Sequence, residues 1–203
     1  MQRHGLPTAR YATFTDFEKA KAYLEAADYK VVVKASGLAA GKGVVLPETK
    51  EAGVEALQNM MLDSQFGAAG TEVVIEECLE GEEVSVLAFC DGTRSVIMPG
   101  AQDHKRVNEG DQGLNTGGMG AYAPAPCLTK PLQREAKDLV DRTVQAMAAE
   151  GTPYVGVLYM GLMLTASGPM VLEYNCRFGD PETQVLLPLL ESDLYDVCMA
   201  CVS

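Results

Sequence analysis

The sequence is short of histidine and of long apolar runs. His4 and His104 are the only histidines among 203 residues, which excludes a histidine-rich metal site. No apolar run is long enough to cross a bilayer, and residues 1–10 carry Arg3 and Arg10 where a signal peptide would have an apolar segment. We therefore expect a cytoplasmic protein with no membrane partner.

Clusters of basic residues are also missing. Sixteen Lys and Arg face 28 Asp and Glu, for a formal net charge of −12, and no block of Lys or Arg stands out. We therefore expect no nucleic-acid partner. An acidic protein of this kind can still bind phosphate groups, but only through a few placed cations, backbone amides and metal ions.

The six cysteines are scattered through a chain that is 47% hydrophobic and 22% charged, an ordinary globular composition with room for one core or two small lobes. This distribution indicates reduced thiols in a cytosolic protein. Cys198-x-x-Cys201 has no second pair, so a packing role is favoured over a redox or zinc role.

Residues 11–79 predict strand, helix, two strands, helix and strand. Thr15 stands three residues before Glu18, a capping-box spacing, and predicts a helix through about Ala27. A second helix is predicted from its apolar spacing over residues 50–63. The strands are expected at residues 11–14, 30–35, 43–46 and 71–79.

The rest of the chain predicts two pairs of long strands and a helical end. The strand pairs are expected over 82–99 and 154–177, with turns at Asp91-Gly92 and Ser167-Gly168-Pro169. The helices are expected from Thr129 to about Glu150, from Asp180-Pro181 to a stop or kink at Pro188, and after Asp193. Residues 99–126 predict a long loop, which is functional or disordered in a compact domain.

The stretch VVVKASGLAAGKGVVL, residues 31–46, has the composition of a phosphate-binding loop. It does not fit G-x-x-x-x-G-K-[ST], and Gly43 leads into a strand rather than a helix. A glycine loop between two strands can cover a triphosphate, with Lys34 on the entering strand and Lys42 at the tip. The loop alone leaves open a simple β-turn with a solvated lysine.

The stretch LEYNCRFGDPE, residues 172–182, predicts a metal site. Glu173, Asn175 and Arg177 would project from one face of a strand, because side chains alternate with a period of two. Carboxylate and amide oxygens suit Mg²⁺, and an adjacent Arg can bind a phosphoryl or carboxylate oxygen. The alternative is a polar edge of a sheet.

Two further stretches carry weaker signals. Glu76 to Leu79 ends a strand, so its backbone could meet an adenine edge, while Glu82 or Glu83 could accept ribose hydroxyls; runs of Glu usually lie in solvent instead. Residues 101–122 concentrate glycines and hydrogen-bonding side chains that could close on a small anionic substrate, or form a disordered loop.

Five stretches taken together resemble the ATP-grasp superfamily and, within it, the phosphoribosylamine–glycine ligases of purine biosynthesis. They are RHGLPTA, VVVKASGLAAGKGV, EECLEGEEVS, AQDHKR with NTGGMGAY, and LEYNCRFGDPETQ, and they run almost from end to end of the chain. NTGGMGAY with NCRFGDPE is the most specific combination. Many ATP-grasp enzymes carry a further acidic metal ligand on the preceding strand, but YMGLML (159–164) has no acid.

The resemblance implies an ATP-grasp fold of α/β (α+β) class with two lobes. Residues 11–77 would form a lid subdomain with a mobile glycine loop, and 78–203 a larger central lobe built on an antiparallel sheet. Residues 1–10 would be a linker. Because members of this family have a further domain at each end, we expect this chain to be their ATP-grasp portion, normally joined to N- and C-terminal domains.

The resemblance also implies ATP with Mg²⁺, which Mn²⁺ could replace, and the substrates glycine and 5-phosphoribosylamine. Glycine would form glycyl phosphate, which the amine of 5-phosphoribosylamine would then attack. The implied metal ligands are Glu173 and Asn175, and the implied catalytic residues are Arg177 and Lys42. The implied nucleotide contacts are Lys34, Gly41, Lys42, Gly43, Glu76, Glu77, Leu79, Glu82 and Glu83. The implied substrate contacts are Asp103, Lys105, Asn115, Thr116, Gly117, Gly118 and Asp180.

Two other functions stay open from the sequence. One is a related ATP-grasp ligase that joins a different carboxylate and amine. The other is a nucleotide-binding module without ligase activity, although such a module has no need for Lys42, Glu173, Asn175 and Arg177 together.

Overall fold

The computed structural model of the chain describes residues 1–37, 43–63, 70–110, 112–116 and 118–203. The chain forms two units. Unit 1 combines Met1–Thr8 with Glu80–Ser203, and unit 2 is Ala9–Leu79. Residues 1–10, expected to be a linker, therefore divide between the two units.

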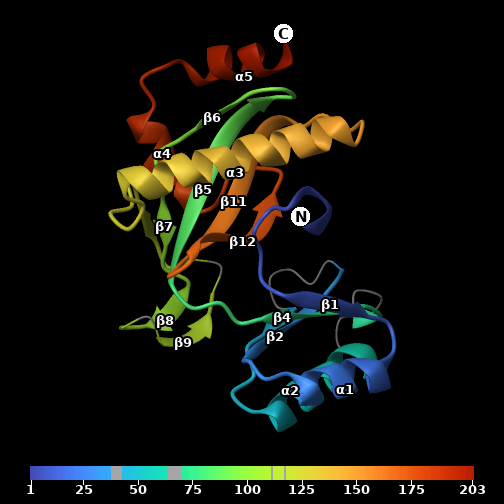
Figure 1. The fold of residues 1–203 in the computed structure, drawn as a ribbon. Helices are drawn as coiled ribbons and strands as arrows, with labels where there is room; N and C mark the ends of the chain where they lie inside the picture. The colour runs from blue at the N-terminus through green and yellow to red at the C-terminus, as the bar shows by residue number, and fades with distance from the viewer. Residues whose placement is uncertain (38–42, 64–69, 111, 117) are drawn as a thin grey trace. The chain divides into compact units, whose positions relative to one another are not determined.

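Unit 2 is a four-stranded antiparallel sheet with two helices on one face (Figure 1). The strand order is β1 (Tyr11–Phe14), β4 (Val73–Glu77), β2 (Val31–Ala35) and β3 (Val44–Val45). The helices are α1 (Phe17–Ala26) and α2 (Lys50–Met61). Apolar side chains of both helices pack on the sheet, among them Leu24, Leu57 and Ile75, which are fully buried.

The first helix of unit 2 begins one residue later than the sequence predicted. Asp16, not Thr15, takes the N-cap position, and its side chain accepts a hydrogen bond from the backbone N–H of Lys19. The capping-box spacing of Thr15 and Glu18 therefore misplaced the cap. The second helix has Thr49 at its N-cap, which accepts from the N–H of Ala52.

Unit 1 is built on a second antiparallel sheet, with order β12-β11-β5-β6. Its strands are β5 (Glu82–Asp91), β6 (Ser95–Ile97), β11 (Val155–Thr165) and β12 (Gly168–Asn175). The long helix α3 (Lys130–Ala149) lies across one face of this sheet (Figure 1). The predicted strand pairs and the helix after Thr129 are confirmed, although the second turn lies before Gly168, which already belongs to β12.

Both faces of the unit 1 sheet carry apolar clusters. Val84, Val86 and Met160 belong to the cluster that includes side chains of α3. Leu87 and Phe89 point the other way and pack with residues of α4 (Glu182–Leu186) and α5 (Leu194–Val202). Coverage on both sides explains why residues 84–90 form an unbroken buried run rather than an alternating one.

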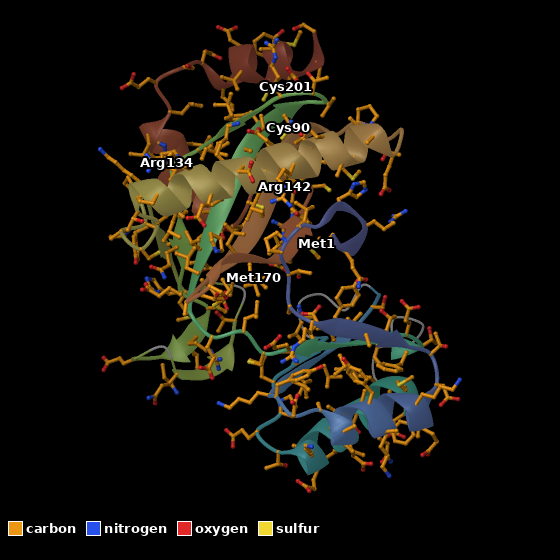
Figure 2. All side chains as sticks on the ribbon, viewed as in Figure 1. Met1, Cys90, Arg134, Arg142, Met170 and Cys201 are labelled. Atoms are coloured by element: carbon orange, nitrogen blue, oxygen red, sulfur yellow. The ribbon has the colours of Figure 1, made fainter. Side chains whose placement is uncertain are left out.

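The N-terminal segment of unit 1 is attached to β12 and α3. It contains the short helix η1 (Gln2–His4) and the buried Leu6. The N–H of Val171 donates to the carbonyl of Pro7 at 2.9 Å. Figure 2 shows Met1 beside the part of α3 that carries Arg142, and Arg142 Nη2 donates to the carbonyl of Gly5 at 2.7 Å.

The predicted loop over residues 99–126 contains four short strands, so that prediction was wrong. β7 (Gln102–Asp103) pairs with β10 (Ala121–Tyr122), and β8 (Arg106–Asn108) pairs with β9 (Gln112–Asn115). In addition, Ser85 and Ala101 exchange backbone hydrogen bonds, which places the start of this segment beside β5.

The C-terminal end of unit 1 is helical, as the sequence predicted. Asp193 caps α5 by accepting from the N–H groups of Tyr195 and Asp196, and a short helix, η3 (Leu187–Leu189), contains Pro188. All six cysteines, which fall within the described ranges, are free thiols. Among helices in those ranges, none has both the length and the apolarity that crossing a bilayer requires.

Candidate active site

The candidate site in unit 1 occupies the sheet face opposite α3. Two rows of residues cross the strands there: Ser85, Gly161 and Glu173 in one row, and Leu87, Tyr159 and Asn175 in the next. Residues directly opposite each other on antiparallel strands have Cβ atoms about 4.5–5.5 Å apart. The register therefore places Glu173 and Asn175 side by side at the edge strand of this face.

Glu173 and Asn175 supply oxygen donors of the kind that fits Mg²⁺. Glu173 is exposed at the end of β12, and Tyr174 between the two residues points to the opposite face, where its hydroxyl meets Thr143 at 2.8 Å. In the described part of the chain, no three or more His, Cys, Asp or Glu side chains gather as a metal site. One carboxylate and one amide suit a Mg²⁺ ion that takes its remaining ligands from water and phosphates.

Lys105 brings a cation to this face, near Glu83, Glu173 and Asp103. Its Nζ lies 3.2 Å from Glu83 Oε2. Burial alone would lower the pKa of Lys105, but the carboxylates of Glu83, Glu173 and Asp103 more than offset this, so its pKa is raised. Lys105 is therefore a fixed positive charge between acidic side chains, a suitable partner for a phosphoryl or carboxylate oxygen.

Asp103 has a buried carboxylate oxygen that lacks a hydrogen-bond partner. Among the described residues it is the only buried side-chain oxygen or nitrogen of this kind, and it is Oδ1. Burial, helped by the negative charge of Glu182, raises the pKa of Asp103 to about 6. An unpartnered polar atom of this kind is costly to the fold, which indicates a functional role.

Gly118 closes over Asp103, and only a glycine fits there. A Cβ on this residue would lie 2.9 Å from Asp103 Oδ1 and 2.7 Å from Pro181 Cδ, and its φ of +127° disfavours any other residue. Thr116 links Lys105 to Gly118: its hydroxyl donates to the carbonyl of Lys105 and accepts from the N–H of Gly118. Asp103, Lys105, Thr116 and Gly118 are thus brought together as a group.

Asp103→Asn is expected to stabilise the protein by about 1 kcal/mol at pH 7.5, a gain of about 2–4 °C in Tm. The pKa of Asp103 is raised in the folded state, so its charged form costs stability above about pH 6. That cost disappears as the pH falls through 6 toward the unfolded value of 3.8. Thermal unfolding at both ends of this range checks it, and an equal stabilisation at pH 7.5 and below pH 4 would contradict it.

A buried network that sequence analysis missed lies next to these groups. Glu182 is 2% exposed, and its Oε1 accepts from Ser85 Oγ and from the Tyr159 hydroxyl, each at 2.9 Å. Ser85 and Tyr159 also contact each other at 2.8 Å. The available signals were a serine inside an apolar strand and a Glu in the first turn of a helix, and neither indicates a buried acid.

Two predicted site residues lie outside this group. β12 ends at Asn175, so Arg177 is not on the strand face, and its Nη1 donates to the carbonyl of Phe178 at 2.8 Å. Asp180 is exposed and accepts from the Gln184 side chain at 2.6 Å. Pro181, not Asp180, is the N-cap of α4, so the predicted cap was also wrong.

The remaining predicted residues of unit 1 are less informative. Glu82 is exposed at the start of β5. The backbone of Asn115 pairs with Arg106, but its side chain lies outside the described part of the structure. Gly117 also falls outside it.

Unit 2 carries the predicted nucleotide contacts that precede residue 80. Lys34, on β2, lies 2.6 Å from Glu76 Oε2 on the neighbouring strand β4. Both side chains are about three-quarters buried, at 25% and 21% exposed, so Lys34 and Glu76 form a partly buried ion pair and not two solvated charges. Gly43 accepts a backbone hydrogen bond from Ala35 at the start of β3. Gly41 and Lys42 lie outside the described residues.

Glu77 has a structural partner within unit 2. Arg10 donates to both of its carboxylate oxygens, at 2.9 and 3.2 Å, and also stacks on the Tyr29 ring. The hydrogen bond from Arg10 lowers the pKa of Glu77. The Glu77 side chain therefore binds Arg10 within unit 2. Leu79 is half-buried and is the last residue of this unit.

The family model and the similar proteins found by comparison all point to the same family. Residues 1–183 match the model of the phosphoribosylglycinamide synthetase ATP-grasp (A) domain. A phosphoribosylamine–glycine ligase of Streptococcus pyogenes serotype M1 is 59% identical over 194 residues, covering 95% of this chain and 46% of that protein. The human trifunctional purine biosynthetic protein adenosine-3 is 59% identical over 199 residues, covering 97% of this chain and 20% of that protein. The chain thus spans less than half the length of these relatives.

Solved structures agree with this result. The phosphoribosylamine–glycine ligase of Thermotoga maritima superposes with a TM-score of 0.92 at 35% identity, covering 99% of this chain and 51% of that one. The biotin carboxylase domain of Hydrogenobacter thermophilus 2-oxoglutarate carboxylase, solved with MgADP and bicarbonate, has a TM-score of 0.76 at 19% identity and shows the fold alone. The predicted ATP-grasp fold is therefore confirmed.

Proposed function

We infer the function from family membership, since this chain belongs to the phosphoribosylglycinamide synthetase ATP-grasp (A) domain family. We propose that it binds Mg·ATP and serves a ligase that joins glycine to 5-phosphoribosylamine. The observation that carries this proposal is the match over residues 1–183 together with 59% identity to a phosphoribosylamine–glycine ligase. The products would be glycinamide ribonucleotide, ADP and phosphate.

The proposed reaction has two steps with balanced atoms. A carboxylate oxygen of glycine attacks the γ-phosphorus of ATP, which gives glycyl phosphate and ADP. The amine of 5-phosphoribosylamine then attacks the acyl carbon, loses a proton and releases inorganic phosphate. Both steps concentrate negative charge on phosphoryl oxygens and require water to be excluded from an acyl phosphate that hydrolyses easily.

The charged groups of the chain suit the first step. Glu173 and Asn175 would hold Mg²⁺, which neutralises the β- and γ-phosphates when it is bound. Lys34 would bind phosphate oxygens in exchange for its contact with Glu76, and Lys42 is proposed for the same task. Arg177 would stabilise the transferring phosphoryl group. Its exposure leaves the guanidinium accessible to a ligand.

The group around Asp103 suits the two nitrogen-bearing substrates. The Asp103 carboxylate can accept a hydrogen bond from an amino group, and Lys105 can bind a carboxylate or phosphate oxygen nearby. Thr116 and Gly118 fix this group, and Asn115, Gly117 and Asp180 are proposed as further contacts. Glu83 pairs with Lys105 here, so it would have to exchange partners to accept a ribose hydroxyl.

Isothermal titration of Mg·ATP into the chain tests nucleotide binding. We expect saturable binding by the chain. In a full-length ligase that carries this domain, we expect repeated ADP release to require both glycine and 5-phosphoribosylamine, because glycyl phosphate must be consumed before the next turnover. Alanine in place of glycine is the matched control and should support little release. Binding of Mg·ATP without any glycine-dependent release would favour a nucleotide-binding module, and no binding at all would contradict the proposal.

A further inference from the structure

The buried carboxylate of Glu182 is the most unusual group in unit 1 outside the residues already assigned. It lies in the first turn of α4, and its two partners, Ser85 on β5 and Tyr159 on β11, are neutral hydroxyl donors. Burial, together with the nearby carboxylates of Glu182 and Glu173, raises the pKa of Tyr159, so the phenol keeps its proton and acts as a donor. The network therefore joins one buried carboxyl group to two hydroxyl groups, without a cation among its three members.

Such an arrangement would lower the stability of the fold, so stability alone does not explain why it is there. A buried carboxylate needs strong compensation, and two neutral hydroxyl groups provide less than a cation would. An apolar side chain would fill the same space without this cost. The hydrogen bonds that Glu182 accepts from Ser85 and Tyr159 therefore indicate a role in the site beside it.

The absence of a side chain at Gly179 leaves room for the Glu182 carboxylate. A Cβ on Gly179 would lie 2.3 Å from Glu182 Oε2 and 3.1 Å from Tyr159 Cε2. No other residue fits at position 179 unless the carboxylate moves. The turn between β12 and α4 thus fixes where Glu182 meets the sheet.

The partners of Glu182 are neighbours of the proposed metal ligands. Tyr159 is directly opposite Asn175 in the β11–β12 register. Ser85 belongs to the row that continues through Gly161 to Glu173. Gly161 leaves room for both neighbours: a Cβ on it would lie 3.2 Å from Glu173 Cγ and 3.7 Å from Tyr159 Cε1. Because Tyr159 also stands opposite Asn175, its orientation limits the orientation available to Glu173 and Asn175.

We propose that Glu182 is a positioning residue: by holding Tyr159 and Ser85, it orients Glu173 and Asn175 toward a metal–nucleotide ligand. This inference rests on the proposed function, because it assumes that these two residues meet Mg·ATP. Groups that orient metal ligands typically change metal affinity by about 10–100-fold when they are removed. The effect should therefore appear in metal-dependent binding and not in binding of the nucleotide alone.

The test measures the metal gain, defined as the ratio of the ATP dissociation constant in EDTA to that in excess Mg²⁺. Isothermal titration gives both constants for each variant, and thermal unfolding gives Tm. Glu182→Ala should reduce the metal gain about tenfold, and Tyr159→Phe by roughly 3- to 10-fold. Glu182→Gln keeps an oxygen that accepts from both hydroxyls, so it should stay within about threefold of the wild type.

Tyr174→Phe is the matched control. It also removes a hydrogen-bonded tyrosine hydroxyl from unit 1, and it lies between the two metal ligands, but it faces Thr143 on the other side of the sheet. Its metal gain should equal that of the wild type even if its Tm falls. A merely structural role for Glu182 would lower Tm in the Glu182 and Tyr159 variants and leave the metal gains of all four variants alike.

The outcomes separate the two proposals. If the wild-type chain shows no metal gain, the proposed metal role fails, and this inference fails with it. If the wild type shows the gain but Tyr159→Phe matches Tyr174→Phe, only the inference is overturned. A loss in Glu182→Gln as large as that in a folded Glu182→Ala would also overturn it, and Tyr159→Phe decides the matter if Glu182→Ala does not fold.

Discussion

Glu173→Ala is expected to remove the metal-dependent part of ATP affinity. Losing the only carboxylate of the proposed metal pair should weaken Mg·ATP binding by roughly 30-fold, or about 2 kcal/mol. In EDTA the variant should bind ATP at least as tightly as the wild type, because the carboxylate then has no ion to hold and only repels the phosphates. Titrations in both conditions measure this difference.

The control for Glu173→Ala is Glu135→Ala. Glu135 is an exposed carboxylate of the same unit on α3, the helix that covers the opposite face of the sheet. Its loss changes the net charge by the same amount, so it reports any general electrostatic effect on ATP. Equal weakening by both substitutions, or equal weakening in Mg²⁺ and in EDTA, would contradict the assignment of Glu173 to the metal.

The sequence predicted the metal pair because the period-two rule holds inside a strand. β12 continues through Asn175, so Glu173 and Asn175 share a face as expected. The same rule failed at Arg177 because the strand ends two residues earlier, whereas the break signals in the sequence, Gly179 and Asp180-Pro181, come only after Arg177. Extending a strand pattern past the last paired residue is therefore the step that went wrong.

The prediction of an irregular loop over residues 99–126 was wrong for a different reason. Its strands are two to four residues long, and their partners lie elsewhere in the segment or on β5. Glycine-rich polar segments have low strand propensity, so such pairings depend on tertiary contacts that no local pattern reveals. The prediction that this segment contacts the substrate rests on the chemistry of its side chains and not on its secondary structure. The short strands therefore do not test it, and it stays a prediction.

Glu182 could not be predicted because its partners are far away in the chain. Ser85 is 97 residues distant and Tyr159 is 23 residues distant. An acidic residue in the first turn of a helix is ordinarily explained by the helix dipole, and that explanation looks sufficient from sequence. Only its burial against two hydroxyl groups distinguishes it from a surface acid.

Lys34→Ala is expected to weaken ATP binding with or without metal. A charge-assisted hydrogen bond contributes about 1.5–3 kcal/mol, so the dissociation constant should rise about 10- to 100-fold in Mg²⁺ and in EDTA alike. The metal gain would then stay unchanged, the opposite of the result expected for Glu173→Ala. The two substitutions together separate contacts made by a lysine from contacts made through an ion.

Lys19→Ala is the control for Lys34→Ala, because Lys19 is an exposed lysine of the same unit, on α1. It should leave ATP affinity within about twofold, as surface substitutions away from a site usually do. Lys34 also pairs with Glu76, so its loss leaves a partly buried carboxylate without this cation, and thermal unfolding must accompany the titration. A lower Tm with unchanged ATP affinity would show that Lys34 serves the sheet of unit 2 and not the nucleotide.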